Sequence, residues 1–141
     1  MKAIVCQQFG PPESLVYADM PQPVPGPGEV RVEMHAVGVN FTDLLAIEGR
    51  SQLKRELPMI PGVEGAGVVR ECGPGVLTFR PGQRVLGIKT SGAFAEQVVL
   101  PVTNVWHHWA GIDEEVAAIF DPFGNAVHTA LTFPVLGEDV L

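Results

Sequence analysis

Proline and glycine recur so often along this chain that few uninterrupted segments could form more than a short strand or helix. The sequence holds 13 prolines and 16 glycines among 141 residues. Proline cannot donate a hydrogen bond to a strand ladder and disrupts helix interiors, and glycine weakens both kinds of element. The short apolar runs between them predict a mainly β domain with many turns. Because 46% of the residues are hydrophobic, such a domain can bury a core.

The first hundred residues predict strands that form a small, partly closed barrel. Residues 21–30 contain four prolines and predict an extended connector rather than a strand or helix. After it, Val30 and Val32 alternate with charged residues, which indicates a half-buried strand. Gly65 and Gly67 suggest a bulge or the close approach of another backbone. The other predicted strands are 2–7, 15–20, 62–72, 83–88 and 93–100.

Helical spacing appears in three places. Residues 41–48 predict a short helix that Gly49 ends. A second helix is predicted to begin at Asp113, a good N-cap residue, and Pro122 is expected to interrupt it. The helix after this break carries three apolar residues at i, i+4 and i+8 and is expected to end near Pro134. These three residues are Phe123, Val127 and Leu131.

Charge and cysteine content narrow the possible partners and location. The net charge is −7 and the pI is about 4.9, so no positive field exists to attract nucleic acid or an anionic membrane. The two cysteines fit a reducing cytoplasm, and each is expected to be buried as a small hydrophobic residue. The N-terminal apolar run is too short for a signal peptide, and no run reaches the roughly 18 residues of a membrane span. We therefore expect a cytoplasmic protein.

The histidines and cysteines do not form a recognisable metal site. His107 and His108 are adjacent, so on a strand they would point to opposite faces, and a solvated loop is the favoured interpretation. His128 has no usual ligand at helical spacing and is expected in the core or on a helix surface. Cys6 and Cys72 lack the spacing of a structural zinc site. No nucleophilic triad motif or phosphate-binding loop occurs.

Four polar residues stand in otherwise apolar surroundings and are the candidate site residues. Asn40, Thr42 and Asp43 lie at the predicted strand-to-helix junction. Helix capping by Asn40 and Asp43 is the favoured explanation, and ligand binding is the alternative. Glu64 lies in an apolar run, so it either faces solvent or is a buried carboxylate with a partner.

Five stretches within residues 1–105 follow the order of a known family. They are MKAIVCQQFGPPESL, PGPGEVRVEMHAVGVNFTDLLAIEGR, PMIPGVEGAGVV, GPGVLTFRPGQRVLGI and GAFAEQVVLP. In these stretches the chain resembles the N-terminal domain of medium-chain dehydrogenases/reductases, specifically the zinc-free NAD(P)H:quinone oxidoreductases. The resemblance implies a GroES-like partial β-barrel, in agreement with the predicted strands.

The resemblance also implies that the chain binds no zinc. Zinc-dependent members of the superfamily have a cysteine at the position of Asn40 and a histidine at the position of Val63, and neither Asn nor Val is a zinc ligand. Glu64 and Asp121 match positions that can ligate zinc in relatives, but two carboxylates alone make a poor zinc site. The cysteine-rich lobe that holds a structural zinc is missing as well.

The last third, residues 112–141, resembles the zinc-dependent threonine dehydrogenases. Either a junction between two relatives near residues 104–106 or divergence within one family would explain this. In the family, the final residues 137–141 are the first strand of the nucleotide-binding domain, and the chain ends before the G-x-G-x-x-G turn. We expect a barrel domain over 1–105, and connecting helices with the start of an incomplete nucleotide-binding domain over 106–141.

The resemblance implies a catalytic-domain fragment of an NAD(P)H-dependent quinone or enone oxidoreductase that is inactive alone. NAD(P)H would be the cofactor of the complete enzyme, and no cofactor is expected to bind this chain by itself. Asn40 and Asp43 would shape the nicotinamide end of the cleft. Thr42 matches a proton-relay hydroxyl of the zinc enzymes, but Leu45 stands where threonine dehydrogenases have a histidine.

Two other functional hypotheses stay open. The chain could be a non-catalytic interaction module or an engineered chimera, or it could be a fragment of a threonine or alcohol dehydrogenase-like enzyme. In each case, the helix with Phe123, Val127 and Leu131 and the segment Val140–Leu141 leave an apolar surface. We expect this surface to fold back onto the barrel or to self-associate.

Overall fold

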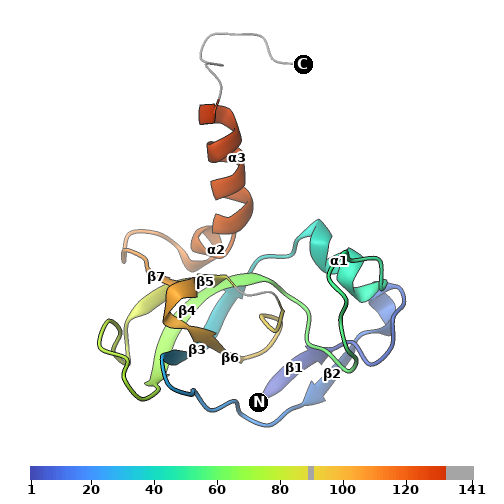
Figure 1. Cartoon of the computed structure of the whole chain (residues 1–141), viewed down its shortest axis with the longest axis horizontal. Coiled ribbons are helices and arrows are strands. Elements are labelled where there is room, and N and C mark those ends of the chain that lie inside the picture. Colours follow the sequence, from blue (N-terminus) through green and yellow to red (C-terminus); the bar gives the residue numbers. More distant parts are fainter. Residues whose placement is uncertain (89–90, 133–141) are drawn as a thin grey trace.

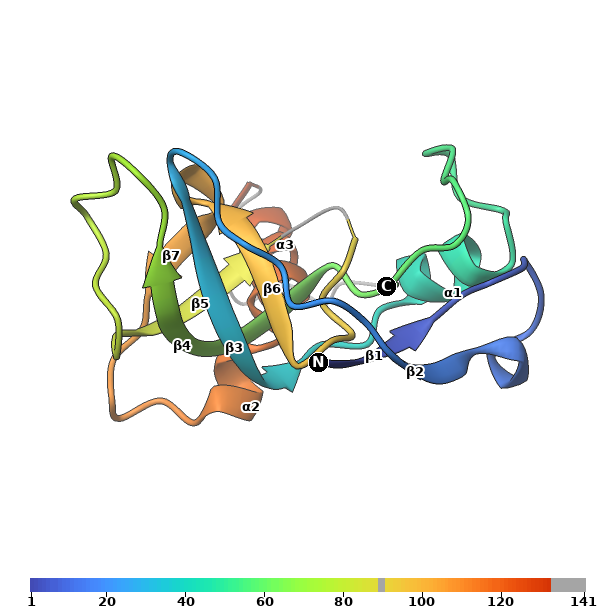
Figure 2. The same cartoon turned by 90° about the horizontal axis from the view of Figure 1, so that it is seen from below.

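Two antiparallel sheets form the body of the molecule in the computed structural model, which describes residues 1–88 and 91–132 (Figures 1 and 2). The smaller sheet pairs β1 (Lys2–Val5) with β2 (Val16–Asp19). The larger, curled sheet has the order β6-β3-β4-β5-β7. Its strands are β3 (Glu29–Val37), β4 (Glu64–Cys72), β5 (Arg84–Ile88), β6 (Gln97–Pro101) and β7 (Val105–His107). The predicted mainly β, half-barrel fold is confirmed.

The core lies inside the curl of the five-stranded sheet. Val30 and Val32 of β3 are fully buried, whereas the alternating residues Arg31 and Glu33 are half-buried, as the pattern predicts. Their apolar neighbours come from the other strands and from the turn before β5. These neighbours include Val69, Phe79, Val85, Val98, Leu100 and Val105. Cys6 is fully buried, as expected, while Cys72 is only half-buried.

At Gly67, β3 and β4 lie too close together to admit a side chain. A Cβ atom at this position would collide with the backbone carbonyl of Glu33, and the β3–β4 register shifts between Met34 and Ala36. The prediction of a close backbone approach is therefore confirmed.

The helix α1 (Phe41–Ile47) follows β3 and begins at Asn40, as the sequence predicts. The Asp43 carboxylate accepts a hydrogen bond from the Asn40 backbone N–H at 2.8 Å, which is the acidic half of a capping box. Gly49 ends the helix with a φ of +72°, a conformation that glycine adopts without strain. These bonds fix the direction in which α1 leaves the sheet.

The first helix after the sheet begins where expected, but the second begins earlier than expected, before Pro122. α2 (Glu114–Ala117) follows Asp113, and α3 (Phe120–Thr132) starts two residues before Pro122. The expectation that Pro122 interrupts a helix is therefore wrong. It lies in the first turn of α3, where its missing N–H would have no partner inside the helix. The predicted end near Pro134 lies outside the described residues.

α3 stands out from the barrel instead of folding back onto it (Figure 1). No residue of α3 is buried, and Phe123 and Leu131 are 56% and 74% exposed. His128 lies on the surface of this helix. Self-association through this surface stays a prediction, and its other expected part, Val140–Leu141, lies outside the described residues. None of the helices in the described part of the chain is long and apolar enough to cross a membrane.

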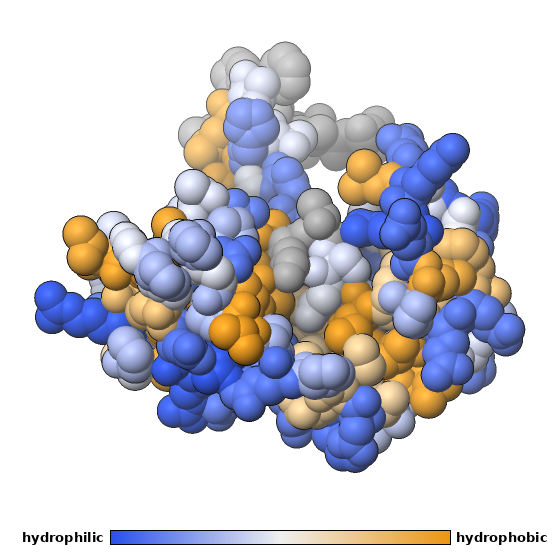
Figure 3. Space-filling view, turned by 60° about the horizontal axis from the view of Figure 1, so that its bottom comes forward, coloured by the Kyte–Doolittle hydropathy of each residue, from blue (hydrophilic) through white to orange (hydrophobic). Residues whose placement is uncertain are grey.

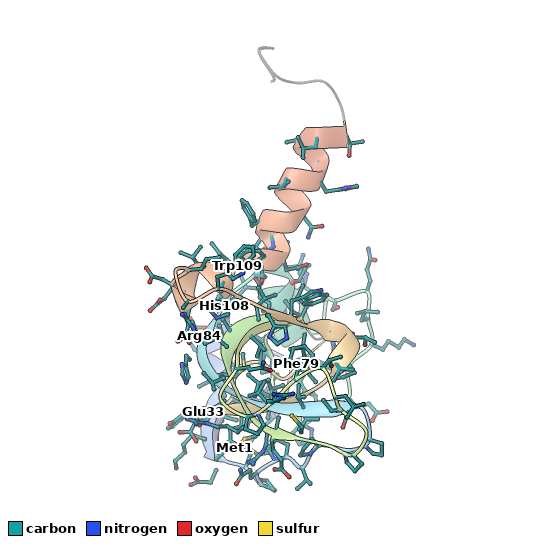
Figure 4. The ribbon with its side chains drawn as sticks, turned by 90° about the vertical axis from the view of Figure 1, so that its left-hand side faces the viewer. Met1, Glu33, Phe79, Arg84, His108 and Trp109 are labelled. Atoms are coloured by element: carbon teal, nitrogen blue, oxygen red, sulfur yellow. The ribbon has the colours of Figure 1, made fainter. Side chains whose placement is uncertain are left out.

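The segment between β7 and α2 is tied to β5 by Arg84, which is labelled in Figure 4 together with His108 and Trp109 of this segment. The Arg84 guanidinium donates hydrogen bonds to the carbonyls of Ala110 at 2.9 Å and Ile112 at 2.8 Å. His107 ends β7 and is exposed, whereas His108 is buried. The expectation of a solvated loop for this pair is therefore wrong, because β7 and the following turn pack beside β5. The predicted domain boundary at 105/106 stays a prediction.

Candidate functional site

A cleft of about 560 Å³ opens between α1 and the start of α3, which lie on the same side of the barrel in Figure 1. We call it the α1 cleft. One wall comes from α1 and the loop after it, and the other from the segment before β4 and the first turn of α3. The residues that line it include Thr42, Asp43, Arg50, Arg55, Val63 and Asp121.

Asp43 is a buried carboxylate held by two backbone N–H groups. Its Oδ2 atom accepts from Asn40 at 2.8 Å, and its Oδ1 atom accepts from Gly62 at 3.2 Å. Burial raises the pKa of Asp43, while these two bonds and the charge of Arg55 act in the opposite direction. Asp43 therefore joins the start of α1 to the segment that leads into β4.

Glu64 is the second buried carboxylate, with 2% of its surface exposed. Its Oε1 atom accepts a hydrogen bond from the Asn40 side-chain amide at 2.7 Å. Its Oε2 atom accepts one from the backbone N–H of Asp121 at 2.8 Å. Of the two alternatives for Glu64, the structure shows the buried carboxylate with partners. It ties the barrel to the N-terminal turn of α3, where a negative charge is favourable.

Asn40 connects the two carboxylates. Its backbone N–H binds Asp43, and its side-chain amide binds Glu64. The capping interpretation of the Asn40–Asp43 pair is thus confirmed, while a ligand-binding role for either residue stays a prediction. The sequence identifies Asn40, Asp43 and Glu64 only as separate candidates, and the fold joins them in one hydrogen-bond network.

Thr42 and Leu45 face the cleft without a catalytic partner. Thr42 is exposed, and its hydroxyl forms no hydrogen bond with the residues that the structure describes. Leu45 lines the same cleft with an apolar side chain. This arrangement leaves the Thr42 hydroxyl available to a ligand but offers it no acid or base for proton relay.

The residues around Glu64 do not fit a zinc ion. Val63 offers no lone pair, and both oxygens of Glu64 already accept hydrogen bonds from N–H donors. Asp121 contributes its backbone N–H to this network, and its Oδ1 atom lies 3.5 Å from the Asn125 amide. Within residues 1–88 and 91–132, no cluster of three or more His, Cys, Asp or Glu side chains could hold a metal ion.

Arg50 and Arg55 are cleft residues that the motif search misses. Both come from the loop after α1, where the sequence carries three cationic residues within six positions, 50–55. This local concentration of positive charge in an acidic chain is the signal that could identify them.

Comparison with protein families and curated sequences gives two results. Residues 26–110 match the family model described as the alcohol dehydrogenase GroES-like domain. The L-threonine 3-dehydrogenase of Streptomyces avermitilis is 40% identical, in a match that covers 100% of this chain and 49% of the relative. The chain thus spans about half the length of the curated relatives it matches. The likeness to threonine dehydrogenases extends over the whole chain and is not confined to its last third.

Solved structures of oxidoreductases are similar over nearly the same range. A probable oxidoreductase from Mycobacterium abscessus has a TM-score of 0.87 and 36% identity, covering 93% of this chain and 42% of that one. The Escherichia coli quinone oxidoreductase, solved as a complex with NADPH, has a TM-score of 0.87 and 28% identity, covering 95% and 42%. The choice between a junction near residues 104–106 and divergence within one family stays open.

Proposed function

We propose a function for this chain from its family, because it belongs to the alcohol dehydrogenase GroES-like domain family. The proposal is that the chain supplies one wall of the catalytic cleft of a medium-chain dehydrogenase/reductase. The α1 cleft would be that wall. The matched relatives are about twice as long as this chain, so the other wall would come from a nucleotide-binding domain.

The reaction that we propose for the complete enzyme is zinc-free, NAD(P)H-dependent reduction of a quinone or enone. The observation that carries this proposal is the pairing of Asn40 with Glu64 at 2.7 Å. Where zinc-dependent relatives have a zinc ligand, Asn40 instead donates to Glu64, one of the two carboxylates left at ligand positions. A bound nicotinamide would supply the hydride. Residues of this chain would shape the nicotinamide end through Asn40 and Asp43 and offer the Thr42 hydroxyl to the substrate.

A zinc-dependent threonine or alcohol dehydrogenase is the second candidate. It is favoured by the 40% identity to L-threonine 3-dehydrogenase across the whole chain. The first candidate needs no zinc and transfers hydride from NAD(P)H to its substrate. The second needs zinc and transfers hydride from its substrate to NAD⁺. A non-catalytic interaction module would show neither activity.

Metal content separates the first two candidates. After dialysis, the chain is expected to retain far less than one zinc per molecule, because Asn40 and Val63 are not ligands. The double variant Asn40→Cys/Val63→His restores the ligand types of the zinc-dependent relatives beside Glu64 and should retain more zinc. Metal analysis by mass spectrometry checks both.

Assays of the longest gene product that contains this chain complete the test. Oxidation of NADPH by a benzoquinone or an enone, unaffected by chelators, would support the proposal. Stoichiometric zinc together with NAD⁺-dependent oxidation of L-threonine would overturn it in favour of the second candidate. Absence of both activities from a gene product with a nucleotide-binding domain would also contradict it.

The 141 residues alone are expected not to oxidise NADPH. In this superfamily the dinucleotide is held mainly by the G-x-G-x-x-G turn and the helix after it, and this motif does not occur in residues 1–141. Without it, the nicotinamide loses the advantage of positioning, which can reach effective concentrations of about 10⁵ M. A calorimetric titration with NADPH and a quinone reduction assay check this. Saturable binding at low micromolar NADPH would contradict it.

A further inference from the structure

Positive charge is concentrated on the loop after α1, although the chain as a whole carries a net charge of −7. Arg50, Lys54 and Arg55 supply three of the nine Lys and Arg residues of the sequence. Arg50 and Arg55 line the α1 cleft, and Lys54 and Arg55 line a smaller hollow of about 270 Å³ on the same loop. Figure 3 shows hydrophilic side chains, blue, on the right-hand side of the molecule that carries α1, and also on its left and lower parts.

Arg55 differs from the other half-buried arginines that the structure describes. Arg31 binds the carboxylate of Glu71 at 2.8 Å, and Arg84 binds two backbone carbonyls. The Nε atoms of Arg31, Arg55 and Arg84 are all enclosed without a hydrogen-bond partner. Arg55 differs because its other guanidinium nitrogens also form no hydrogen bond or ion pair with any described residue. A buried polar group in a native protein normally has a partner. The fold thus brings a guanidinium into the cleft without satisfying it.

Asp43 is not the missing partner. Its oxygens accept hydrogen bonds from the backbone N–H groups of Asn40 and Gly62, and among the described residues no hydrogen bond or ion pair joins it to Arg55. Arg55 lies near enough for its charge to oppose the effect of burial on the pKa of Asp43. Its hydrogen-bond donors remain unused.

We propose that Arg55 binds an anionic group, a carboxylate or a phosphate, of the ligand that occupies the α1 cleft. A guanidinium presents paired N–H donors that match the paired oxygens of either group. Arg50 is the less available cation, because it already pairs with Glu48 at 3.0 Å. This inference rests on the proposed function and narrows it, since a neutral quinone offers Arg55 no charge whereas an acidic substrate or a cofactor phosphate does.

The test measures binding to the 141-residue chain, so it does not depend on catalysis. Backbone amide signals of residues 42–63 are followed by NMR during titration with pyruvate, with nicotinamide mononucleotide and with uncharged acetone. Both anions are to be compared at the same ionic strength, because screening weakens such contacts. The variants are Arg55→Gln, which removes the charge, and Arg55→Lys, which keeps it without the paired donors. The matched control is Arg80→Gln, which removes an exposed charge outside the cleft.

We expect at least one anion to shift these signals saturably at millimolar concentration, and acetone not to. Binding should weaken about tenfold in Arg55→Gln, less in Arg55→Lys, and not in Arg80→Gln. Preference for pyruvate would assign the group to the substrate, and preference for the mononucleotide would assign it to the cofactor. No saturable shift with either anion, or equal affinity in Arg55→Gln and the unmodified chain, would overturn the proposal. Zinc content and turnover, which test the proposed function, are separate readouts.

Discussion

Replacing Glu64 with alanine is expected to destabilise the folded chain by about 3 kcal/mol or more and to lower its melting temperature by roughly 10 °C. The carboxylate is 2% exposed and accepts hydrogen bonds from the Asn40 side chain and the Asp121 backbone. Alanine would leave both donors without an acceptor and would create a cavity under the base of α3. Thermal and denaturant unfolding measure the loss.

The isosteric variant Glu64→Gln removes the negative charge but can keep both hydrogen bonds, so it separates their contributions to stability. The glutamine carbonyl can accept from the Asp121 N–H. The glutamine NH₂ can donate to the Asn40 side-chain oxygen once the Asn40 amide rotates by half a turn. We therefore expect Glu64→Gln to cost no more than about 1 kcal/mol. Glu13→Ala is the surface control, because Glu13 is exposed. If Glu64→Ala were as stable as Glu13→Ala, Glu64 would not tie the barrel to α3.

Hydrogen exchange gives the local readout of the same change. The Asp121 amide is bonded to Glu64 and lies in the first turn of α3, so it should exchange much faster in Glu64→Ala. Asp121 also lines the α1 cleft. A loosened α3 would therefore move one wall of the proposed site, and the effect of Glu64 on ligand binding would be indirect.

Local sequence rules predict the elements whose pattern is set by their own residues. The alternation of Val30 and Val32 predicts the buried face of β3, and the Asn40–Asp43 spacing predicts the start of α1. Pro122 shows the limit of such rules, because proline both ends helices and fits their first turn. In the structure Ala117 and Ala118 are buried against the sheet, and α2 ends there, so the next helix begins before Pro122.

The site could be predicted residue by residue but not as a network. Asn40 and Glu64 are 24 positions apart, and Glu64 and Asp121 are 57 positions apart. No periodic pattern relates residues at such separations, and only the fold brings them together. Arg55 escapes sequence reasoning for a different reason. A charged residue in a polar loop is ordinarily exposed, and nothing in the loop sequence shows that its Nε atom is enclosed.

Replacing Gly67 with alanine is expected to have a similarly large effect, a loss of about 3 kcal/mol or more or failure to fold. Gly67 lies in β4, opposite Met34 of β3 on one side and Val85 of β5 on the other. Its new Cβ atom would collide with the backbone carbonyl of Glu33. Because β4 is held between two strands, it cannot move away without breaking ladder hydrogen bonds on the other side.

The matched control is Gly124→Ala, where the same methyl group meets open space on α3. There it should stabilise the helix by up to about 1 kcal/mol, because alanine has the higher helix propensity. The two alanine variants should therefore shift the unfolding midpoint in opposite directions. If Gly67→Ala unfolded like the unmodified chain, β3 and β4 would have to lie farther apart than the structure shows. That spacing also sets Glu64, at the start of β4, against Asn40, just beyond the end of β3, so the network beneath the α1 cleft would have to differ as well.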